Sequence, residues 1–181
     1  LDKELQSQTS LTAINSINWA RLMAQVVYYF WAYIQLEMEN VNFIVPSGNF
    51  GNIFSARIAQ HMGLPINQLH IVTNQNDILK KIISSGMMVL RDVQQTYSPS
   101  MDIQISSNFE RQIFESLNKD DEAVKKIMNE FTNNKKYIFD KKILKLFQKI
   151  YQSAAISNET TLETIKSYKK NYNYLADPHT A

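Results

Sequence analysis

Two short apolar runs, residues 41–45 (VNFIV) and 69–73 (LHIVT), constrain the fold most, because segments with helical patterns surround both of them. Runs of this length are typical of strands in the interior of a sheet. Apolar residues recur at helical spacing over about 17–39, which predicts a long helix with a broad buried face, and helices are also predicted over 52–62 and 77–85. The alternation of helices and strands predicts an α/β fold, in which helices cover a parallel sheet.

Capping residues predict where several of these helices begin and end. Gly63 and Gly86 follow two helical patterns, at the position where a left-handed residue commonly closes a helix. Asn76 is expected to cap the helix that follows it. Ser107 and Glu110 have the spacing of a capping box, which predicts a further helix directly after them.

Charge divides the chain close to residue 118. Residues 1–118 hold seven Lys and Arg against nine Asp and Glu, a net charge of −2, whereas residues 119–170 hold twelve Lys against seven Asp and Glu, a net charge of +5. We therefore expect an α/β part over 1–118, followed by a lysine-rich, mostly helical segment over 119–181 that leads back to the first part. The lysines are expected to lie on solvated helix faces, since lysine is rarely buried.

The second region repeats apolar residues at three- and four-residue steps. This pattern predicts helices over 122–131 and 141–155. A last helix, from about residue 159 to 174, is expected to be capped by Ser157 or Asn158.

Composition excludes several classes of protein and of site. The total charge of +2 gives no electrostatic case for nucleic acid, and the absence of Cys excludes disulfides, thiolate zinc sites and a cysteine nucleophile. The three His have no metal-ligand spacing, and no run approaches the roughly 18 apolar residues of a membrane span. We expect a cytoplasmic protein without metal, nucleic-acid or membrane partners, and the lack of an initial Met is consistent with a fragment.

The segment PSGNFGN, between the first predicted strand and the next helix, is the strongest candidate for chemistry. Gly48 and Gly51 have no Cβ to obstruct an anion, Asn49 and Asn52 can donate from their side-chain amides, and the start of a helix adds unpaired N–H groups and a positive dipole end. The segment therefore favours phosphate binding, with an ordinary tight turn as the alternative. It matches neither the Walker nor the Rossmann pattern.

A second polar cluster, NSINWAR, precedes the long predicted helix. Asn15, Ser16 and Asn18 are residues that commonly cap helices, which explains the cluster without any ligand. The alternative is that the cluster holds an anion together with Arg21, because arginine makes bidentate contacts with phosphate.

These motifs, taken in order, resemble the threonine synthase family in its longer bacterial and fungal form. The similarity rests on residues 15–33, 43–78 and 96–111, and on the terminal YLADPHTA. The resemblance implies a pyridoxal 5'-phosphate enzyme of fold type II, the parallel-sheet fold of the tryptophan synthase β subunit. It also implies conversion of the small molecule O-phosphohomoserine, with water, into threonine and inorganic phosphate. In that chemistry pyridoxal phosphate acts as an electron sink.

The resemblance also implies roles for individual residues. The loop that would cradle the cofactor phosphate consists of Ser47, Gly48, Asn49, Phe50, Gly51 and Asn52. The residues that would hold the substrate phosphate are Asn15, Ser16, Arg21 and Asn52. The family's Schiff-base lysine lies upstream of NSIN and its ring-nitrogen partner lies after DPHTA, so we expect this chain to hold no catalytic residue and to be active only within a complete protein.

Two other functions stay open at this point. One is a related pyridoxal phosphate lyase, such as a threonine or serine dehydratase. The other is a non-catalytic phosphate-binding module that keeps the fold but not the lysine.

Overall fold

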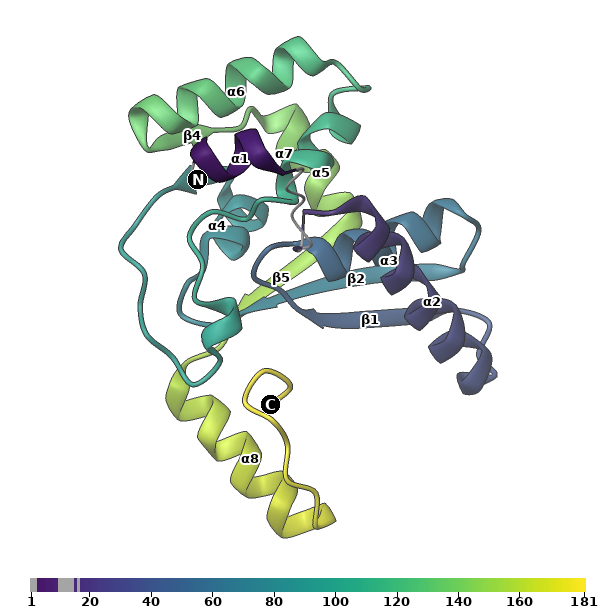
Figure 1. Cartoon of the computed structure of the whole chain (residues 1–181). Helices are drawn as coiled ribbons and strands as arrows, with labels where there is room; N and C mark the ends of the chain where they lie inside the picture. The colour runs from purple at the N-terminus through teal and green to yellow at the C-terminus, as the bar shows by residue number, and fades with distance from the viewer. Residues whose placement is uncertain (1–2, 10–14, 16) are drawn as a thin grey trace.

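The computed structural model describes residues 3–9, 15 and 17–181 as an α/β arrangement of helices and a small parallel sheet (Figure 1). The elements, in chain order, are α1 (Lys3–Gln8), α2 (Trp19–Leu36), β1 (Val41–Pro46), α3 (Gly51–His61), β2 (Ile66–Thr73), α4 (Ile78–Ser85), β3 (Met87–Val89), the 3-10 helix η1 (Pro99–Met101), α5 (Phe109–Ser116), α6 (Asp121–Asn134), β4 (Lys136–Ile138), α7 (Lys141–Ile150), β5 (Tyr151–Ala155) and α8 (Asn158–Tyr172).

The main sheet has the strand order β1-β2-β5, and both of its pairings are parallel. In the middle of the sheet Val45 pairs with Ile71, and Ile71 pairs with Ser153 of β5. The two strands predicted from the apolar runs, and the α/β class, are confirmed. The second strand begins at Ile66, three residues earlier than predicted, and β3 with β4 forms a separate antiparallel pair.

The predicted helix over 141–155 is wrong in its last turn. The helix α7 ends at Ile150, and the next five residues form the strand β5, in which Tyr151 pairs with Leu69. The apolar repeat continues through Tyr151, so periodicity could not show the change. Tertiary contacts decide it, because Tyr151 is 1% exposed and its hydroxyl donates to Gln112 Oε1 at 2.5 Å.

Two predicted helix caps are also wrong. The residue before α4 is Asp77, and Asn76 instead donates its amide to Gln94 O at 2.8 Å and to the Asp102 carboxylate at 3.1 Å. Ser107 does not cap α5, and its hydroxyl donates to Asn49 Oδ1 at 3.3 Å. Both side chains form hydrogen bonds with residues that are distant in the sequence, and sequence spacing cannot reveal such bonds.

Other helix ends are as predicted. Gly86 closes α4 in a left-handed conformation with φ of 75°, and its N–H donates to Ile82 O at 2.8 Å. The Ser157 hydroxyl accepts from Thr160 N at 3.2 Å and so caps α8. The lysines after residue 118 are all exposed, which confirms their expected position on solvated faces.

The hydrophobic core includes residues from both sides of residue 118. Phe109 packs edge-on against Phe139 and Phe147, with ring centroids 6.4 and 5.3 Å apart, and Tyr151 belongs to the same cluster. Three of these four residues come from the lysine-rich region. One core thus contains residues from both sides of residue 118. The division of the chain at this residue into two domains stays a prediction.

The broad buried face predicted for the first long helix is wrong for α2. Its buried residues are Leu22, Val26 and Tyr29, which face α3 and the sheet. Val27 and Trp31 are 62% and 65% exposed. The helix is apolar on more sides than its neighbours can cover, and apolar periodicity alone does not tell which side is covered.

One face of the main sheet is also open among the described residues. On β1, Val41 and Val45 point into the core, whereas Ile44 points away from it and is 71% exposed. On β5, Gln152 and Ala154 are exposed in the same alternation. Parallel sheets are usually covered on both faces, so this surface lacks the cover that such a sheet normally has.

No helix within the described part of the chain is both long and apolar enough to cross a membrane.

The exposed side of α2 predicts that residues 1–181 associate with one another when they are produced alone. We expect the double substitution Val27→Lys and Trp31→Lys to lower this association, because it removes two large exposed apolar side chains from one helix face. Light scattering after size-exclusion chromatography measures the effect. Tyr172→Lys on α8 is the matched control, since Tyr172 is 71% exposed but lies elsewhere. An equal loss of association in the control would contradict the prediction.

Candidate functional site

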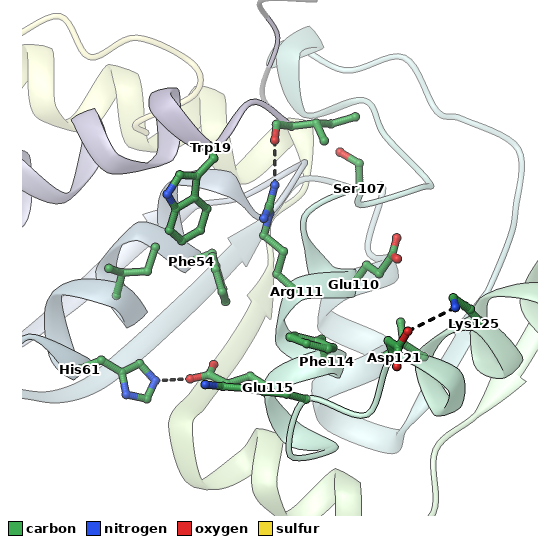
Figure 2. Close-up of a pocket in the computed structure, with 14 residues that line it drawn as sticks. Trp19, Phe54, His61, Ser107, Glu110, Arg111, Phe114, Glu115, Asp121 and Lys125 are labelled. Atoms are coloured by element: carbon green, nitrogen blue, oxygen red, sulfur yellow. Dashed lines mark hydrogen bonds and ion pairs between the residues drawn. The ribbon is translucent and has the colours of Figure 1, made fainter.

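A cavity of about 650 Å³ opens between α2, α3, α5 and α6 (Figure 2). At one wall Arg111 stacks over the Trp19 ring at 5.3 Å and donates to Ile17 O at 2.8 Å. At another wall His61 and Glu115 are in contact. None of the predicted site residues that the structure describes lines this cavity. The predicted phosphate-binding loop is therefore a separate feature.

That loop connects the end of β1 to the start of α3. Ser47 begins it, and its N–H donates to Val72 O at 2.8 Å, so the loop leaves the sheet directly from a paired position. The Ser47 side chain is buried, and its hydroxyl donates to Val45 O at 3.0 Å. The strand thus fixes the first residue of the loop.

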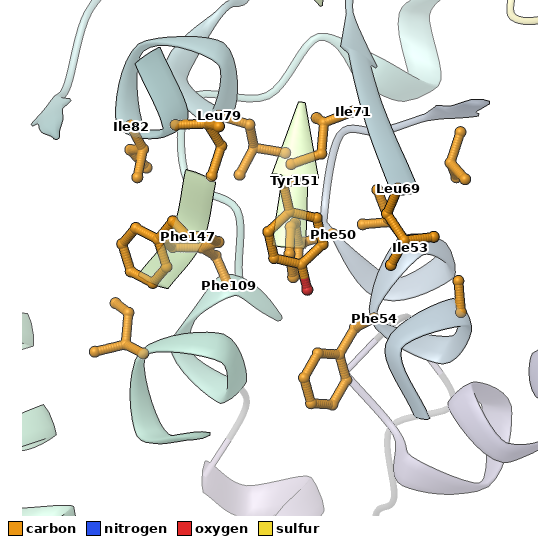
Figure 3. Close-up of a cluster of buried hydrophobic side chains, with 14 of the residues drawn as sticks. Phe50, Ile53, Phe54, Leu69, Ile71, Leu79, Ile82, Phe109, Phe147 and Tyr151 are labelled. Atoms are coloured by element: carbon orange, nitrogen blue, oxygen red, sulfur yellow. The ribbon is translucent and has the colours of Figure 1, made fainter. Parts of the chain in front are cut away.

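Phe50 anchors the other end of the loop in the core (Figure 3). Its side chain is 1% exposed, and its ring lies 5.1 Å from the ring of Phe109 and 5.5 Å from that of Tyr151. Its backbone is left-handed, with φ of 64°, a conformation that costs free energy in a residue other than glycine. Core packing thus maintains the backbone conformation of Phe50.

Position 48 requires glycine because there is no room for a side chain, and not because of its backbone conformation. A Cβ at this position would lie 3.1 Å from Met101 Cα and 3.1 Å from Ile103 Cδ1. The backbone around residue 101 therefore packs directly on the loop. A side chain at position 48 would push the two segments apart.

The loop leads into the N-terminus of α3, where N–H groups are unpaired by helix geometry. The bond from Phe54 N to Phe50 O, at 3.0 Å, is the first turn of this helix. The N–H groups of Gly51, Asn52 and Ile53 precede it and have no acceptor within the helix. Together with the positive end of the helix dipole, they can hold an anion such as a phosphate.

The segment 106–108 holds the outer side of the loop. The Ser106 hydroxyl donates to Gly48 O at 2.8 Å, and both the N–H and the side-chain amide of Asn108 donate to Asn49 O at 3.1 Å. The sequence analysis missed this role. No sequence signal could reveal it, because the partners lie nearly 60 residues apart.

A carboxylate-centred network fixes the backbone that packs on Gly48. Asp102 Oδ1 accepts from Asn74 Nδ2 at 2.8 Å and from Thr96 Oγ1 at 2.7 Å, and its Oδ2 accepts from Thr96 N at 2.9 Å. Asn74 and Asn76 are buried and follow β2 directly. The network joins the TNQND and SPSMD segments, which are far apart in the sequence, beside the loop.

The end of the chain returns to the same neighbourhood. His179 Nε2 accepts from Ser100 N at 3.4 Å, and Asp177 Oδ1 contacts His179 Nδ1 at 2.8 Å. Hydrogen bonds from the His179 N–H and ring lower the pKa of the Asp177 carboxyl. The terminal DPHTA segment thus lies against η1.

Among the predicted substrate-phosphate residues, Asn52 connects the loop to α2. The Tyr29 hydroxyl donates to Asn52 O at 3.0 Å and also contacts its side-chain oxygen. Burial raises the pKa of Tyr29, so this group stays a neutral hydroxyl. The side chain of Asn52 is itself exposed at the start of α3.

The other three predicted residues lie at or before the start of α2. Asn15 accepts from Ile17 N at 3.0 Å, and Asn18 accepts from Ala20 N at 2.9 Å, so both act as turn and cap residues. Arg21 is exposed in the first turn of α2. Ser16 lies outside the described residues. The structure thus joins Asn52 to α2 but shows no shared ligand position for all four.

The described residues contain no group of three or more His, Asp or Glu side chains that could hold a metal ion.

No protein-family model matches the chain, but individual proteins match it closely. The threonine synthase of Saccharomyces cerevisiae is 46% identical over 198 residues, which cover 99% of this chain and 38% of the yeast protein. That of Pseudomonas aeruginosa is 42% identical over 99% of this chain and 39% of its own length. The crystal structure of the pyridoxal phosphate-bound threonine synthase from Brucella melitensis superposes with a TM-score of 0.95 at 46% identity, over 98% of this chain and 39% of that one.

The chain thus spans about two fifths of the length of the curated relatives that it matches. The match covers nearly the whole chain, so it includes both the loop and the segments that hold it. The expected fold, that of the corresponding part of a fold type II enzyme, is confirmed. By sequence and by fold, these 181 residues belong to the threonine synthase family.

Proposed function

We propose that these residues form part of a pyridoxal phosphate-dependent threonine synthase, which converts O-phosphohomoserine and water into threonine and phosphate. The similarity to threonine synthases over nearly the whole chain, one of them solved with pyridoxal phosphate, is the observation that carries the proposal. The proposal includes the cytoplasmic location predicted from the sequence.

The residues of the loop fit the phosphate group of pyridoxal phosphate. Its backbone is fixed at Ser47 by the strand, at Gly48 by close packing and at Phe50 by the core. The N–H groups at the start of α3 then follow. In the proposal, the backbone from Gly48 to Asn52 holds the cofactor phosphate. The bound cofactor would supply an electron sink for the removal of protons from the substrate.

A second phosphate position is proposed for the substrate. Asn52 donates from its side-chain amide, and Arg21, Asn15 and Ser16 contribute from the segment that leads into α2. The contact of the Tyr29 hydroxyl with the Asn52 side-chain oxygen supports this assignment, because it joins the amide group of Asn52 to the same helix. Arginine suits this role, since its charge stabilises the phosphate both in the substrate and as it leaves.

The catalytic lysine is assigned to none of the lysines in these 181 residues. The lysines after residue 118 are exposed, and Lys81 is paired with Asp77 at 2.5 Å. The proposal therefore needs chain outside residues 1–181 for the covalent attachment of the cofactor.

An activity assay on the natural gene product that carries these residues tests the proposal. We expect threonine and inorganic phosphate to form from O-phosphohomoserine in equal amounts, and we expect residues 1–181 alone to be inactive. Deamination of threonine or serine, without phosphate release from O-phosphohomoserine, would instead indicate a dehydratase. Binding of pyridoxal phosphate without either reaction would indicate a non-catalytic module.

Gly48→Ala should lower the affinity for pyridoxal phosphate in that gene product by about tenfold or more. Its Cβ would press on Met101 and Ile103, and overpacking of this kind costs about 1–3 kcal/mol. Cofactor absorbance during equilibrium dialysis measures the loss. Gly63→Ala is the matched control, because Gly63 has φ of 101° in an open turn, so the substitution strains the backbone away from the loop. A similar loss of cofactor in the control would contradict the role of Gly48.

Arg21→Ala should raise KM for O-phosphohomoserine and lower kcat while the cofactor content stays nearly unchanged. The reason is that the guanidinium is proposed to hold the substrate phosphate and not the cofactor. Steady-state kinetics and the cofactor absorbance of the same preparation measure both effects. Lys126→Ala on α6 removes an exposed positive charge elsewhere and serves as control. Loss of cofactor with unchanged substrate affinity would refute the assignment.

A further inference from the structure

We propose that Ser106 and Asn108 are positioning residues, which turn the N–H groups of the glycine loop toward the phosphate of the cofactor. This inference rests on the proposed function, because it concerns how the same loop binds pyridoxal phosphate. Neither residue needs to touch the cofactor. Both act through the backbone carbonyls of the loop.

Hydrogen bonds fix two successive carbonyl groups of the loop from one side. The Ser106 hydroxyl donates to Gly48 O at 2.8 Å. Asn49 O accepts two hydrogen bonds from Asn108, one from its N–H and one from Nδ2, both at 3.1 Å. Asn108 is 0% exposed, and Arg111 Nε donates to its Oδ1 at 3.2 Å. The contact with Arg111 sets the orientation of the amide, because Oδ1 must face the guanidinium and Nδ2 is then turned to Asn49.

The planarity of the peptide bond converts fixed carbonyls into directed N–H groups. In a trans peptide the C=O of one residue and the N–H of the next point in opposite directions within one plane. When Gly48 O is held by Ser106, the N–H of Asn49 points away from segment 106–108. When Asn49 O is held by Asn108, the N–H of Phe50 points the same way. In the proposal, both face the same anion as the N–H groups in the first turn of α3.

Neither end of the loop is free to rotate and so to change the direction of these N–H groups. Phe50 is held in its left-handed conformation by its buried ring, and Ser47 is held by the strand β2. The two peptide planes between them are the part whose orientation depends on Ser106 and Asn108. Without these donors, either carbonyl could turn toward the anion, where its negative end would repel the phosphate. Donors fixed before binding avoid the cost of reorganisation when the ligand arrives.

Binding of pyridoxamine 5'-phosphate and of pyridoxamine to the cofactor-free natural gene product tests the inference. These probes differ only in the phosphate, and they have no aldehyde that would react with surface lysines. We expect Ser106→Ala to weaken binding of pyridoxamine 5'-phosphate by about three- to tenfold, the range for loss of one hydrogen bond, without changing pyridoxamine binding. Isothermal titration calorimetry measures both.

Two further variants separate positioning from general structure. Ser106→Thr keeps the hydroxyl and should restore most of the preference for the phosphate-bearing probe. Ser84→Ala makes the same chemical change on α4, where the hydroxyl lies exposed, and should leave both affinities unchanged. Should Ser106→Ala fail to fold by circular dichroism, Ser106→Cys carries the same expectation, because it keeps the volume but replaces the hydroxyl by a weak donor.

The outcomes separate failure of the proposed function from failure of the positioning role of Ser106 and Asn108. If the unmodified protein binds both probes equally, the phosphate site fails, and the proposed function and this inference fail together. If the unmodified protein prefers the phosphate-bearing probe but Ser106→Ala keeps that preference, or weakens both probes equally, this inference alone is wrong.

Discussion

Burial of the Phe50 side chain is the interaction on which the rest of the candidate site depends. The ring lies among Phe109 and Tyr151, in a core that extends on to α7 and the end of the sheet. Its burial maintains a left-handed backbone that an isolated Phe would rarely adopt. Because Phe50 directly precedes α3, the same contact determines where the helix starts and which N–H groups have no acceptor within the helix. Hydrophobic packing thus sets the geometry of a polar site.

Polar contacts complete the loop from the other side. Segment 106–108 binds the loop carbonyls, and the Asp102 network fixes the backbone that leaves no room for a side chain at Gly48. These contacts bring segments from residue 47 to residue 108 together at the C-terminal end of the parallel strands, where α/β folds commonly bind ligands. Strand β2, segment 106–108, the core and α2 each hold part of the loop.

Two surfaces of the described residues are uncovered, and the relatives contain additional chain. The side of α2 that carries Val27 and Trp31 is apolar and exposed, and the sheet face that carries Ile44 is uncovered among the described residues. Relatives are about two and a half times as long as this chain. Additional chain could cover these surfaces and supply the catalytic lysine of the proposal.

The sequence by itself determined the α/β class, both apolar strands, the loop between the first strand and α3 and most helix ends, because each depends on neighbouring residues. Tertiary structure alone decided that residues 151–155 form a strand, that only one side of α2 is buried and that Asn76 and Ser107 bind distant partners in place of capping helices. Strand pairing, burial and long-range hydrogen bonds depend on which segments meet in space. A local pattern such as the apolar repeat through Tyr151 is compatible with both a helix and a strand. Pairing with β2 decides that this segment is a strand.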